Sequence, residues 1–377
     1  MAAHQELPFQ QTRLCRKAGR FISLTSPPSH HGRNRRFDLF RIIFATMVLL
    51  SHAPEITDGN RSRELFSSLT RSGISFGDVG VMGFFLLSGY LIVQSWQGDP
   101  EFWNYLRKRI LRIVPGYLVA ALLSTVIVGL LAPAVPDFFR HFTYHYPASI
   151  LELDKPKTPA VFPGLFYPDV NGSMWTIPYE FRCYLLVALF GICRLLRRPA
   201  AWIGTTAVLL IVVADKGLER HLEWNQLRAF TGTPKDVYLL TATFFVGGCY
   251  YLLRERIVFR PIFAIPAAIG LVLAAIFLSG NLEIFMILLG GYLLFYVTQV
   301  PIRSLPSIGK FPDISYGVYL YGWPVEALWI WYRRGSPWIA FLISVPICFG
   351  LGWLSWHFVE RPMLKLKRRA TAPLPAP

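Results

Sequence analysis

Apolar stretches long enough to cross a lipid bilayer recur along the whole chain. A spanning helix needs about 20 mostly apolar residues, and ten segments of roughly this length are found in the sequence. Only 16% of the 377 residues are charged, whereas soluble domains carry about 25%. We therefore predict an all-α, polytopic integral membrane protein. The predicted transmembrane segments are 37–56, 76–96, 113–133, 177–194, 199–214, 236–253, 261–279, 281–299, 312–332 and 337–357.

The distribution of basic residues predicts the orientation in the membrane. The chain has 38 Lys and Arg against 22 Asp and Glu, a net charge of +16. Such an excess is compatible with nucleic-acid binding, but in membrane proteins it is typical of cytoplasmic loops. If both termini are cytoplasmic, the cytoplasmic segments hold 24 basic residues and the opposite loops hold 12. We therefore predict cytoplasmic termini and no nucleic-acid partner.

The cysteines predict neither disulfides nor a metal site. Four of the five fall inside apolar segments, where a free cysteine behaves as a small apolar residue. No CxxC pair and no Cys/His metal spacing occurs. The cysteines are Cys15, Cys183, Cys193, Cys249 and Cys348.

The ends of the chain are polar. Residues 1–36 are rich in Arg, Ser and His and lack the apolar run of a signal peptide, so we expect a flexible cytoplasmic arm. A membrane domain is expected over 37–363 and a cytoplasmic tail over 364–377. The longest outer loop, 134–176, is rich in Pro and aromatic residues. These aromatics suit either a polar, ring-bearing ligand or the membrane interface.

An arginine and a histidine share one predicted transmembrane helix, "RIIFATMVLLSH". Eleven steps of about 100° place Arg41 and His52 on one helix face, about 16 Å apart along the axis. Ionisable groups at membrane depth are candidates for function, and histidine can act as base, acid or acyl acceptor. The alternative is structural: Arg41 anchors the inner edge of the helix and His52 is a core histidine.

Two further arginines stand at the predicted cytoplasmic entrance, in "RKRILRIVPGY". Arg109 and Arg112 are three residues apart and so share a helix face. Guanidinium groups in this place can grip phosphates bidentately. They are also ordinary for a cytoplasmic loop.

Acidic groups supply the remaining candidates. In "NGSMWTIPYEFRCYL", Glu180 and Arg182 follow Trp175 at the start of a helix. Glu180 can orient a histidine, hold a substrate hydroxyl, or pair with a cation that braces the helix end. Asp78 lies near the outer end of a glycine-rich segment. Weaker candidates are Asp313, which suits the positive end of its helix, Glu360, an interface cap, and Glu326, a buried carboxylate that needs a partner.

The order of these motifs resembles the family-3 membrane acyltransferases, bacterial proteins that O-acylate carbohydrates and some small molecules. The resemblance spans about residues 37–363. It includes the Arg–ten residues–His signature, the Arg-x-x-Arg signature and the Trp…Glu element. The six matching stretches are "FDLFRIIFATMVLLSH", "GVMGFFLLSGYLI", "FWNYLRKRILRIVPGYL", "MWTIPYEFRCYL", "ISYGVYLYGWPVE" and "FVERP".

The chain departs from the family pattern at three positions. Many members carry a histidine where this chain has Gly322, so a role for a second histidine does not transfer. Thr176 and Pro178 stand where many members have serine. Some members carry a fused extracytoplasmic hydrolase-like domain, and none is expected here after "FVERP".

The resemblance implies transfer of an acyl group, most often acetyl, from a cytoplasmic acyl-CoA such as acetyl-CoA to a carbohydrate hydroxyl on the outer side. Exopolysaccharide, lipopolysaccharide and lipid-linked oligosaccharide are the acceptor classes, and the bacterial inner membrane is the expected location, with lipids as partners. The implied site residues are His52 and Glu180 for catalysis, Arg41, Arg109 and Arg112 for the donor, and Trp175, Asp78, Arg182 and Tyr316 for the substrate.

Two alternatives come from other functional classes. Buried Arg, His and Glu are also used by proton-coupled carriers, so a transporter or flippase of lipid-linked sugars is the second hypothesis. The third is a structural or assembly subunit. The sequence leaves the acceptor, the acyl chain and the oligomeric state open.

Overall fold

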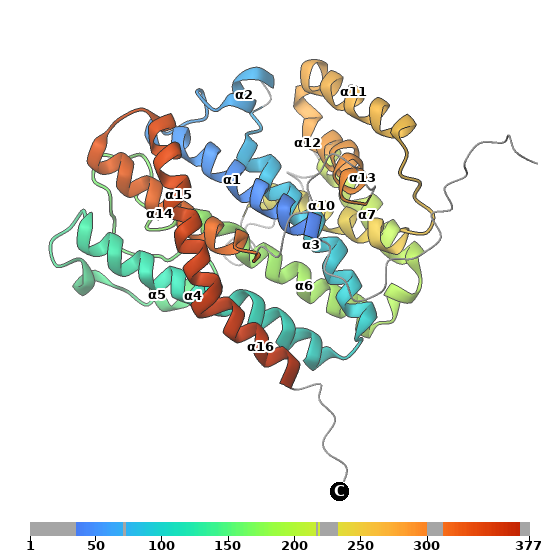
Figure 1. Ribbon diagram of the computed structural model, residues 1–377, viewed down its shortest axis with the longest axis horizontal. Coiled ribbons are helices and arrows are strands. Elements are labelled where there is room, and N and C mark those ends of the chain that lie inside the picture. Colours follow the sequence, from blue (N-terminus) through green and yellow to red (C-terminus); the bar gives the residue numbers. More distant parts are fainter. Residues whose placement is uncertain (1–34, 71–72, 216–217, 219–232, 300–311, 370–377) are drawn as a thin grey trace, which may run out of the picture. The chain divides into compact units, whose positions relative to one another are not determined.

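The computed structural model describes residues 35–70, 73–215, 218, 233–299 and 312–369. Within these residues every regular element is a helix (Figure 1), and the extended pairing seen is one isolated bridge between Pro133 and Val161. The predicted all-α class is thus confirmed. In chain order the elements are α1 (Arg35–Asp58), α2 (Leu65–Thr70), α3 (Phe76–Gly98), α4 (Phe102–Leu131), η1 (Phe138–His141), α5 (His145–Leu151), η2 (Gly172–Thr176), α6 (Ile177–Ile192), η3 (Leu195–Arg197), α7 (Pro199–Ala214), α10 (Pro234–Leu252), α11 (Pro261–Phe277), η4 (Ser279–Asn281), α12 (Leu282–Phe285), η5 (Met286–Gly290), α13 (Gly291–Gln299), α14 (Ser315–Arg333), α15 (Pro337–Ser355), η6 (Trp356–Glu360) and α16 (Arg361–Arg369).

Each of the ten predicted segments coincides with helical structure. In the described part of the chain, five helices are long and apolar enough to cross a membrane, which indicates a multi-pass membrane protein. The other segments form shorter or more polar helices, so ten spans and cytoplasmic termini remain predictions. The five helices are Arg35–Asp58, Phe76–Gly98, Phe102–Leu131, Ser279–Gln299 and Pro337–Leu366.

One predicted boundary is wrong, and two helices contain a π-helical turn. The predicted loop 97–112 is mostly helix, because α4 begins at Phe102, where the Glu101 side chain caps it by accepting from the backbone N–H of Trp103 at 3.0 Å. The last helix runs beyond 363 to Arg369, through the π-helical turn η6. A second π-helical turn, η5, interrupts the segment 281–299. Most of the predicted N-terminal arm and the end of the tail lie outside the described residues.

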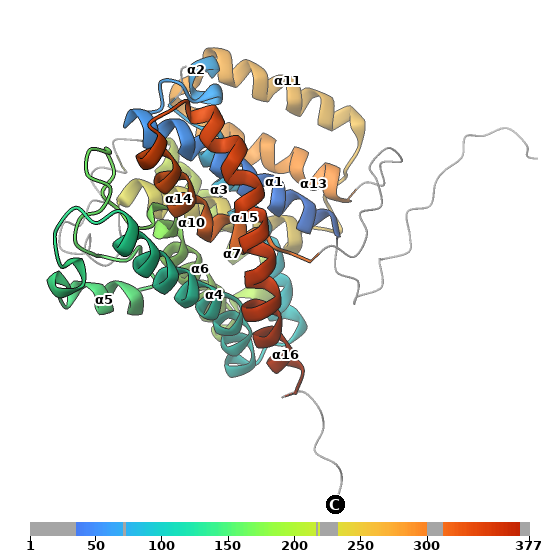
Figure 2. The same ribbon diagram turned by 60° about the vertical axis from the view of Figure 1, so that its left-hand side comes forward.

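Helix α1 packs against α3, α14 and α15 (Figures 1 and 2). Behind it, α3 and α10 approach each other at two glycines. A Cβ atom on Gly247 would lie 2.1 Å from the backbone oxygen of Leu86, and one on Gly89 would lie 1.9 Å from the backbone oxygen of Phe244. Only glycine fits at either position, and small residues of this kind let membrane helices pack closely.

Helix α11 lies at the edge of the helical assembly in both views (Figures 1 and 2) and presents large apolar side chains outward. An apolar outer surface of this kind suits contact with lipid tails. Its exposed residues include Ile262, Phe263, Ile265, Ile269, Val272, Ile276 and Phe277.

The long predicted outer loop is folded. It contains η1, α5 and η2 and is fastened to α14 by hydrogen bonds. The Asn171 side chain donates to the backbone oxygen of Leu320 at 2.8 Å, and the Trp323 indole donates to the backbone oxygen of Asp169 at 3.2 Å. This loop therefore packs against the middle of α14.

Replacing Gly247 with valine is expected to destabilise the protein by about 1–3 kcal/mol, because the added side chain overpacks the contact of α10 with α3. Thermal unfolding in detergent measures the change. The control is Gly204→Ala on α7, where an added Cβ atom meets nothing within 4 Å. Equal unfolding temperatures for the two variants would contradict the close packing.

Candidate functional site

Helix α1 carries two ionisable side chains that both face α14 or the residues just before it. Arg41 Nη1 donates to Asp313 Oδ2 at 2.9 Å. Eleven residues later, about 16 Å along the helix, His52 Nδ1 lies 3.8 Å from Glu326 Oε2. These contacts confirm the common face of Arg41 and His52. We call the two levels the arginine end (Arg41, Asp313) and the histidine end (His52, Glu326); their order shows that α1 and α14 run parallel.

A buried ion network stabilises the arginine end. Asp313 Oδ2 also accepts from Arg112 Nη2 at 2.7 Å, and Arg112 Nη1 donates to Glu360 Oε2 at 3.1 Å. The π-helical turn η6 ends at Glu360, and such turns occur often at functional sites. Gly116, one turn after Arg112, lets the Tyr316 ring approach, because a Cβ atom there would lie 2.7 Å from the ring. Sequence reasoning missed this network, since it gave Asp313 and Glu360 only as helix-end residues.

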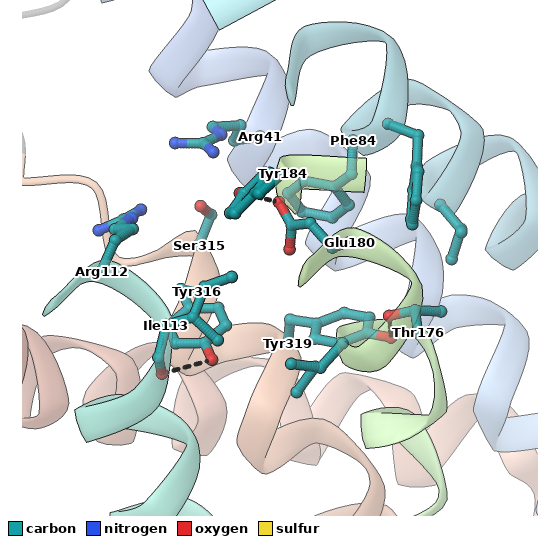
Figure 3. A pocket seen from close by; sticks show the side chains of 13 residues that line it. Arg41, Phe84, Arg112, Ile113, Thr176, Glu180, Tyr184, Ser315, Tyr316 and Tyr319 are labelled. Carbon is teal, nitrogen blue, oxygen red and sulfur yellow. Dashed lines mark hydrogen bonds between the residues drawn. The ribbon is translucent and has the colours of Figure 1, made fainter. Parts of the chain in front are cut away.

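A pocket opens at the arginine end (Figure 3). It contains about 600 Å³ of space outside the atoms, including its open mouth. Charged and hydroxyl-bearing side chains share its wall with apolar ones, the composition typical of small-molecule sites. The lining residues are Arg41, Val81, Phe84, Phe85, Arg112, Ile113, Thr176, Ile177, Glu180, Tyr184, Ser315, Tyr316 and Tyr319.

Glu180 lies inside this pocket (Figure 3). Its Oε1 atom accepts from the Ser88 hydroxyl at 2.9 Å and from the Tyr184 hydroxyl at 2.6 Å. The carboxylate that faces His52 is a different one, Glu326, which is only a weak candidate in the sequence. Nothing local in the sequence pairs His52 with a residue 274 positions away.

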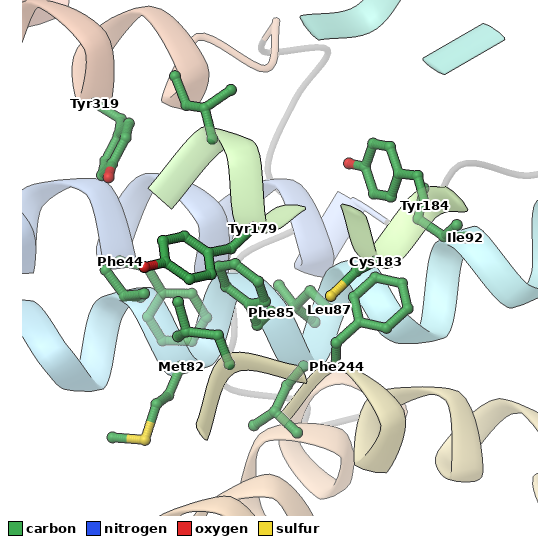
Figure 4. Packing of buried hydrophobic residues seen from close by; sticks show 14 of the residues in the cluster. Phe44, Met82, Phe85, Leu87, Ile92, Tyr179, Cys183, Tyr184, Phe244 and Tyr319 are labelled. Carbon is green, nitrogen blue, oxygen red and sulfur yellow. The ribbon is translucent and has the colours of Figure 1, made fainter. Parts of the chain in front are cut away.

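A packed apolar core fixes the helix that carries Glu180. Figure 4 shows Cys183 of α6 beside Phe85 and Leu87 of α3 and Phe244 of α10. On the same helix, the Tyr184 backbone oxygen accepts from the buried Tyr105 hydroxyl of α4 at 2.9 Å. Glu180 is thus held on rigid elements and not on a loop.

Arg109 lies beside the pocket and does not line it. Its Nη2 donates to the Ser95 hydroxyl at 3.1 Å, and its guanidinium lies 5.6 Å from the centre of the Tyr105 ring and 5.8 Å from that of Tyr184. Cation–π contacts of this kind help a buried guanidinium. Among the described residues, no carboxylate forms an ion pair with Arg109.

The histidine end is buried and has one aromatic ring beside the imidazole. The Trp323 ring lies 5.1 Å from the His52 ring, edge to face. His52 is 9% exposed and Glu326 is fully buried, and within the described residues His52 Nδ1 and both Glu326 carboxylate oxygens lack a hydrogen bond. Buried polar atoms without partners are rare and call for an explanation.

A polar cluster lies beyond the end of α1. Arg61 pairs with Asp78 at 2.6 Å and with Glu55 at 3.4 Å, and the Tyr167 hydroxyl donates to Glu55 at 3.3 Å. Burial lowers the pKa of Arg61, but these two carboxylates outweigh it and raise the pKa above its ordinary value. Burial and the Glu55 carboxylate also raise the pKa of Tyr167.

The four predicted substrate residues do not come together. Tyr316 lines the pocket and donates to the Ile113 backbone oxygen at 2.9 Å. Asp78 caps α3 through Ser75 and pairs with Arg61. Trp175 and Arg182 both contact the Tyr179 ring, with centroid distances of 5.8 and 5.4 Å, and do not line the pocket.

The departures from the family pattern have local explanations. The Thr176 and Tyr319 hydroxyls are hydrogen-bonded at 2.7 Å, which ties η2 to α14. Pro178 occupies the first turn of α6, where proline is favoured. Gly322 faces Leu49 of α1, and a Cβ atom there would lie 2.7 Å from the leucine side chain. A histidine at this position has no room in the present packing.

Within the described residues, no group of three or more His, Cys, Asp or Glu side chains is arranged to hold a metal ion. The described cysteines, Cys183, Cys193, Cys249 and Cys348, are free thiols. Cys15 lies outside the described residues.

Comparisons with known proteins identify the family. Residues 34–357 match the family model described as an acyltransferase domain. An O-acetyl transferase of Shigella phage Sf6 is 27% identical over 333 residues, covering 87% of this chain and 95% of that protein. Nodulation protein 10 of Rhizobium leguminosarum bv. viciae is 27% identical over 382 aligned residues, covering 92% of this chain and 98% of that protein. No solved structure matches.

The motif resemblance is thereby confirmed, and an enzyme is favoured over a transporter or an assembly subunit. The chain belongs to the family of acyltransferases that this domain defines, and it is an acyltransferase.

Proposed function

We propose that this protein moves an acetyl group from cytoplasmic acetyl-CoA, or another acyl group from its acyl-CoA, to a hydroxyl of a surface or exported carbohydrate. The observation that carries the proposal is the two-level arrangement of α1 and α14. Arginines line a pocket at one level, and a histidine faces a carboxylate about 16 Å further along. An acyl-CoA likewise separates its anionic phosphates from its reactive, uncharged thioester, because the two lie at opposite ends of the pantetheine chain.

In this proposal the arginine end faces the cytoplasm and receives the donor. Guanidinium groups bind phosphates through paired N–H groups, which suits Arg41 and Arg112 in the pocket wall. Arg109 is proposed to support the donor site from beside the pocket. The apolar pocket wall suits the pantetheine chain. Glu180 holds the donor by accepting hydrogen bonds from its amide N–H or hydroxyl groups, while Ser88 and Tyr184 keep the carboxylate oriented.

The histidine end performs the transfer. His52 Nδ1 faces Glu326, so Nε2 is the nitrogen that takes the proton from the acceptor hydroxyl. The hydroxyl oxygen then bonds to the thioester carbonyl carbon, the C–S bond breaks, and the CoA thiolate leaves and takes up a proton. A transient acyl group on the same histidine nitrogen requires the same placement.

The acceptor side rests on the family resemblance and on the relative named as an O-acetyl transferase. Exopolysaccharide, lipopolysaccharide and lipid-linked oligosaccharide are the proposed acceptor classes, reached from the outer face of the bacterial inner membrane. Asp78 belongs to the polar cluster beyond α1 and is proposed to contact the acceptor. Trp175 in η2 and Arg182 in α6 are proposed to contribute to binding of the acceptor.

Replacing His52 with alanine is expected to lower acyl transfer about 10²–10⁴-fold, because the general base is lost. The measurement is the O-acyl content of surface glycans in a deletion strain that carries either the wild-type gene or the variant. Glu326→Gln is expected to lower it in the same direction, because the carboxylate that orients His52 is lost.

The matched control is His141→Ala, which changes an exposed histidine on η1. It is expected to restore the ester fully. Wild-type ester in the His52→Ala strain, at equal membrane levels, would refute the mechanism. An ester that differs in no strain would refute a surface-glycan acceptor.

Glu180→Gln is expected to raise KM for acyl-CoA by about 10–100-fold, because a hydrogen bond to a charged acceptor is worth about 1.5–3 kcal/mol. Steady-state kinetics in isolated membranes measure it. Glu255→Gln, at an exposed glutamate paired with Arg254, serves as the charge-matched control. A lowered kcat with unchanged KM would instead return Glu180 to the catalytic role predicted from the sequence.

A further inference from the structure

Both arginines that line the pocket already have carboxylate partners. Asp313 Oδ2 accepts from Arg41 at 2.9 Å and from Arg112 at 2.7 Å, and Glu360 accepts from Arg112 at 3.1 Å. The four side chains are largely buried, with 17%, 16%, 3% and 1% of the Arg41, Arg112, Asp313 and Glu360 side chains exposed. Two positive and two negative charges balance among these four side chains, so the two carboxylates oppose the attraction of the arginines for an anionic ligand.

A phosphate would need the same N–H groups that Asp313 now occupies. One carboxylate oxygen bridges two guanidinium groups, which is a geometry that a phosphate oxygen also adopts. A spare donor remains beside it, because Arg41 Nε is buried and lacks a hydrogen bond within the described residues. The pocket reaches both arginines directly.

We infer that Asp313 occupies the position of a donor phosphate oxygen between Arg41 and Arg112, and that the phosphate displaces it when acyl-CoA binds. Asp313 is then a positioning residue, since it holds the two guanidinium groups ready without touching the reacting atoms. This inference rests on the proposed function, because it takes the pocket to be the donor site.

The local structure suits such an exchange. Asp313 precedes the first residue of α14, so its backbone is not locked inside the helix. Its second oxygen, Oδ1, accepts from the Ser315 hydroxyl at 2.5 Å. In the inferred exchange this hydrogen bond is retained while the contacts of Oδ2 with the two arginines break. Glu360 stays on Arg112 and holds that guanidinium in place.

Asp313→Asn is expected to bind CoA on the order of tenfold more tightly than the wild type, because a competing anion is removed. Calorimetry on the full chain in detergent measures the affinity for CoA, for dephospho-CoA and for phosphate-free pantetheine. Pantetheine affinity is expected to stay unchanged. Glu283→Gln, which breaks the 2.7 Å pair with Lys235 outside the pocket, removes one negative charge as the matched control and is expected to leave CoA affinity unchanged.

Should Asp313→Asn fail to fold, Glu360→Gln tests whether a carboxylate beside Arg112 opposes phosphate binding, with an expected tightening of roughly threefold. Unchanged or weaker CoA binding in the folded variants would overturn the inference and make the network purely structural. Equal tightening of pantetheine would also overturn it, because no phosphate is then involved. A wild type that binds no CoA at all refutes the proposed donor instead, which is a separate result.

Discussion

The buried ion pairs of Arg41 and Arg112 decide where several helices of this protein meet. Breaking a buried ion pair by removing one partner commonly costs about 3–5 kcal/mol, so each guanidinium tethers the element that supplies its carboxylate. Arg41 and Arg112 tether α1 and α4 to the start of α14 and to the end of η6. The pocket forms where these elements converge.

The two levels of α1 differ in how far their buried polar atoms are hydrogen-bonded. At the arginine end the charges balance and the carboxylates are hydrogen-bonded. At the histidine end, His52 Nδ1 and the Glu326 oxygens are buried without hydrogen bonds. The first level gives rigidity. The histidine end leaves hydrogen-bonding positions on His52 and Glu326 unoccupied, so that a substrate group or a proton can bind there in the proposed mechanism.

Much of the helical architecture is predictable because the signal is local. Runs of apolar residues locate all ten segments, and the spacing of Arg41 and His52 predicts their shared face. The start of α4 is not predicted, because Arg107, Lys108 and Arg109 follow its first turn and a cluster of basic residues is typical of a loop. The pairing of side chains is not local. Asp313 meets Arg41 across 272 positions, and no periodicity within α1 indicates its partner.

The same limit explains the candidate site. Arg112 and Glu180 are predicted by residue type and Tyr316 by the family resemblance, and all three line one pocket. Glu326 is only a weak candidate in the sequence, because a single glutamate in an apolar helix gives no indication of its spatial neighbour, which is His52. Arg109 is the opposite case. The Arg-x-x-Arg motif predicts that it binds the donor, but its guanidinium lies beside the Tyr184 ring and does not line the pocket.

The contacts of α1 with α14 also constrain the order in which the protein can assemble during synthesis. Arg41 and His52 emerge from the ribosome early, but their carboxylates follow only with α14, and Glu360 comes near the end of the chain. Until then Arg41 of the first helix lacks its carboxylate partner Asp313, and the bilayer does not tolerate such a charge well. Assembly therefore closes around the last helices, and a chain interrupted before α14 lacks the anions that hold its first helix in place.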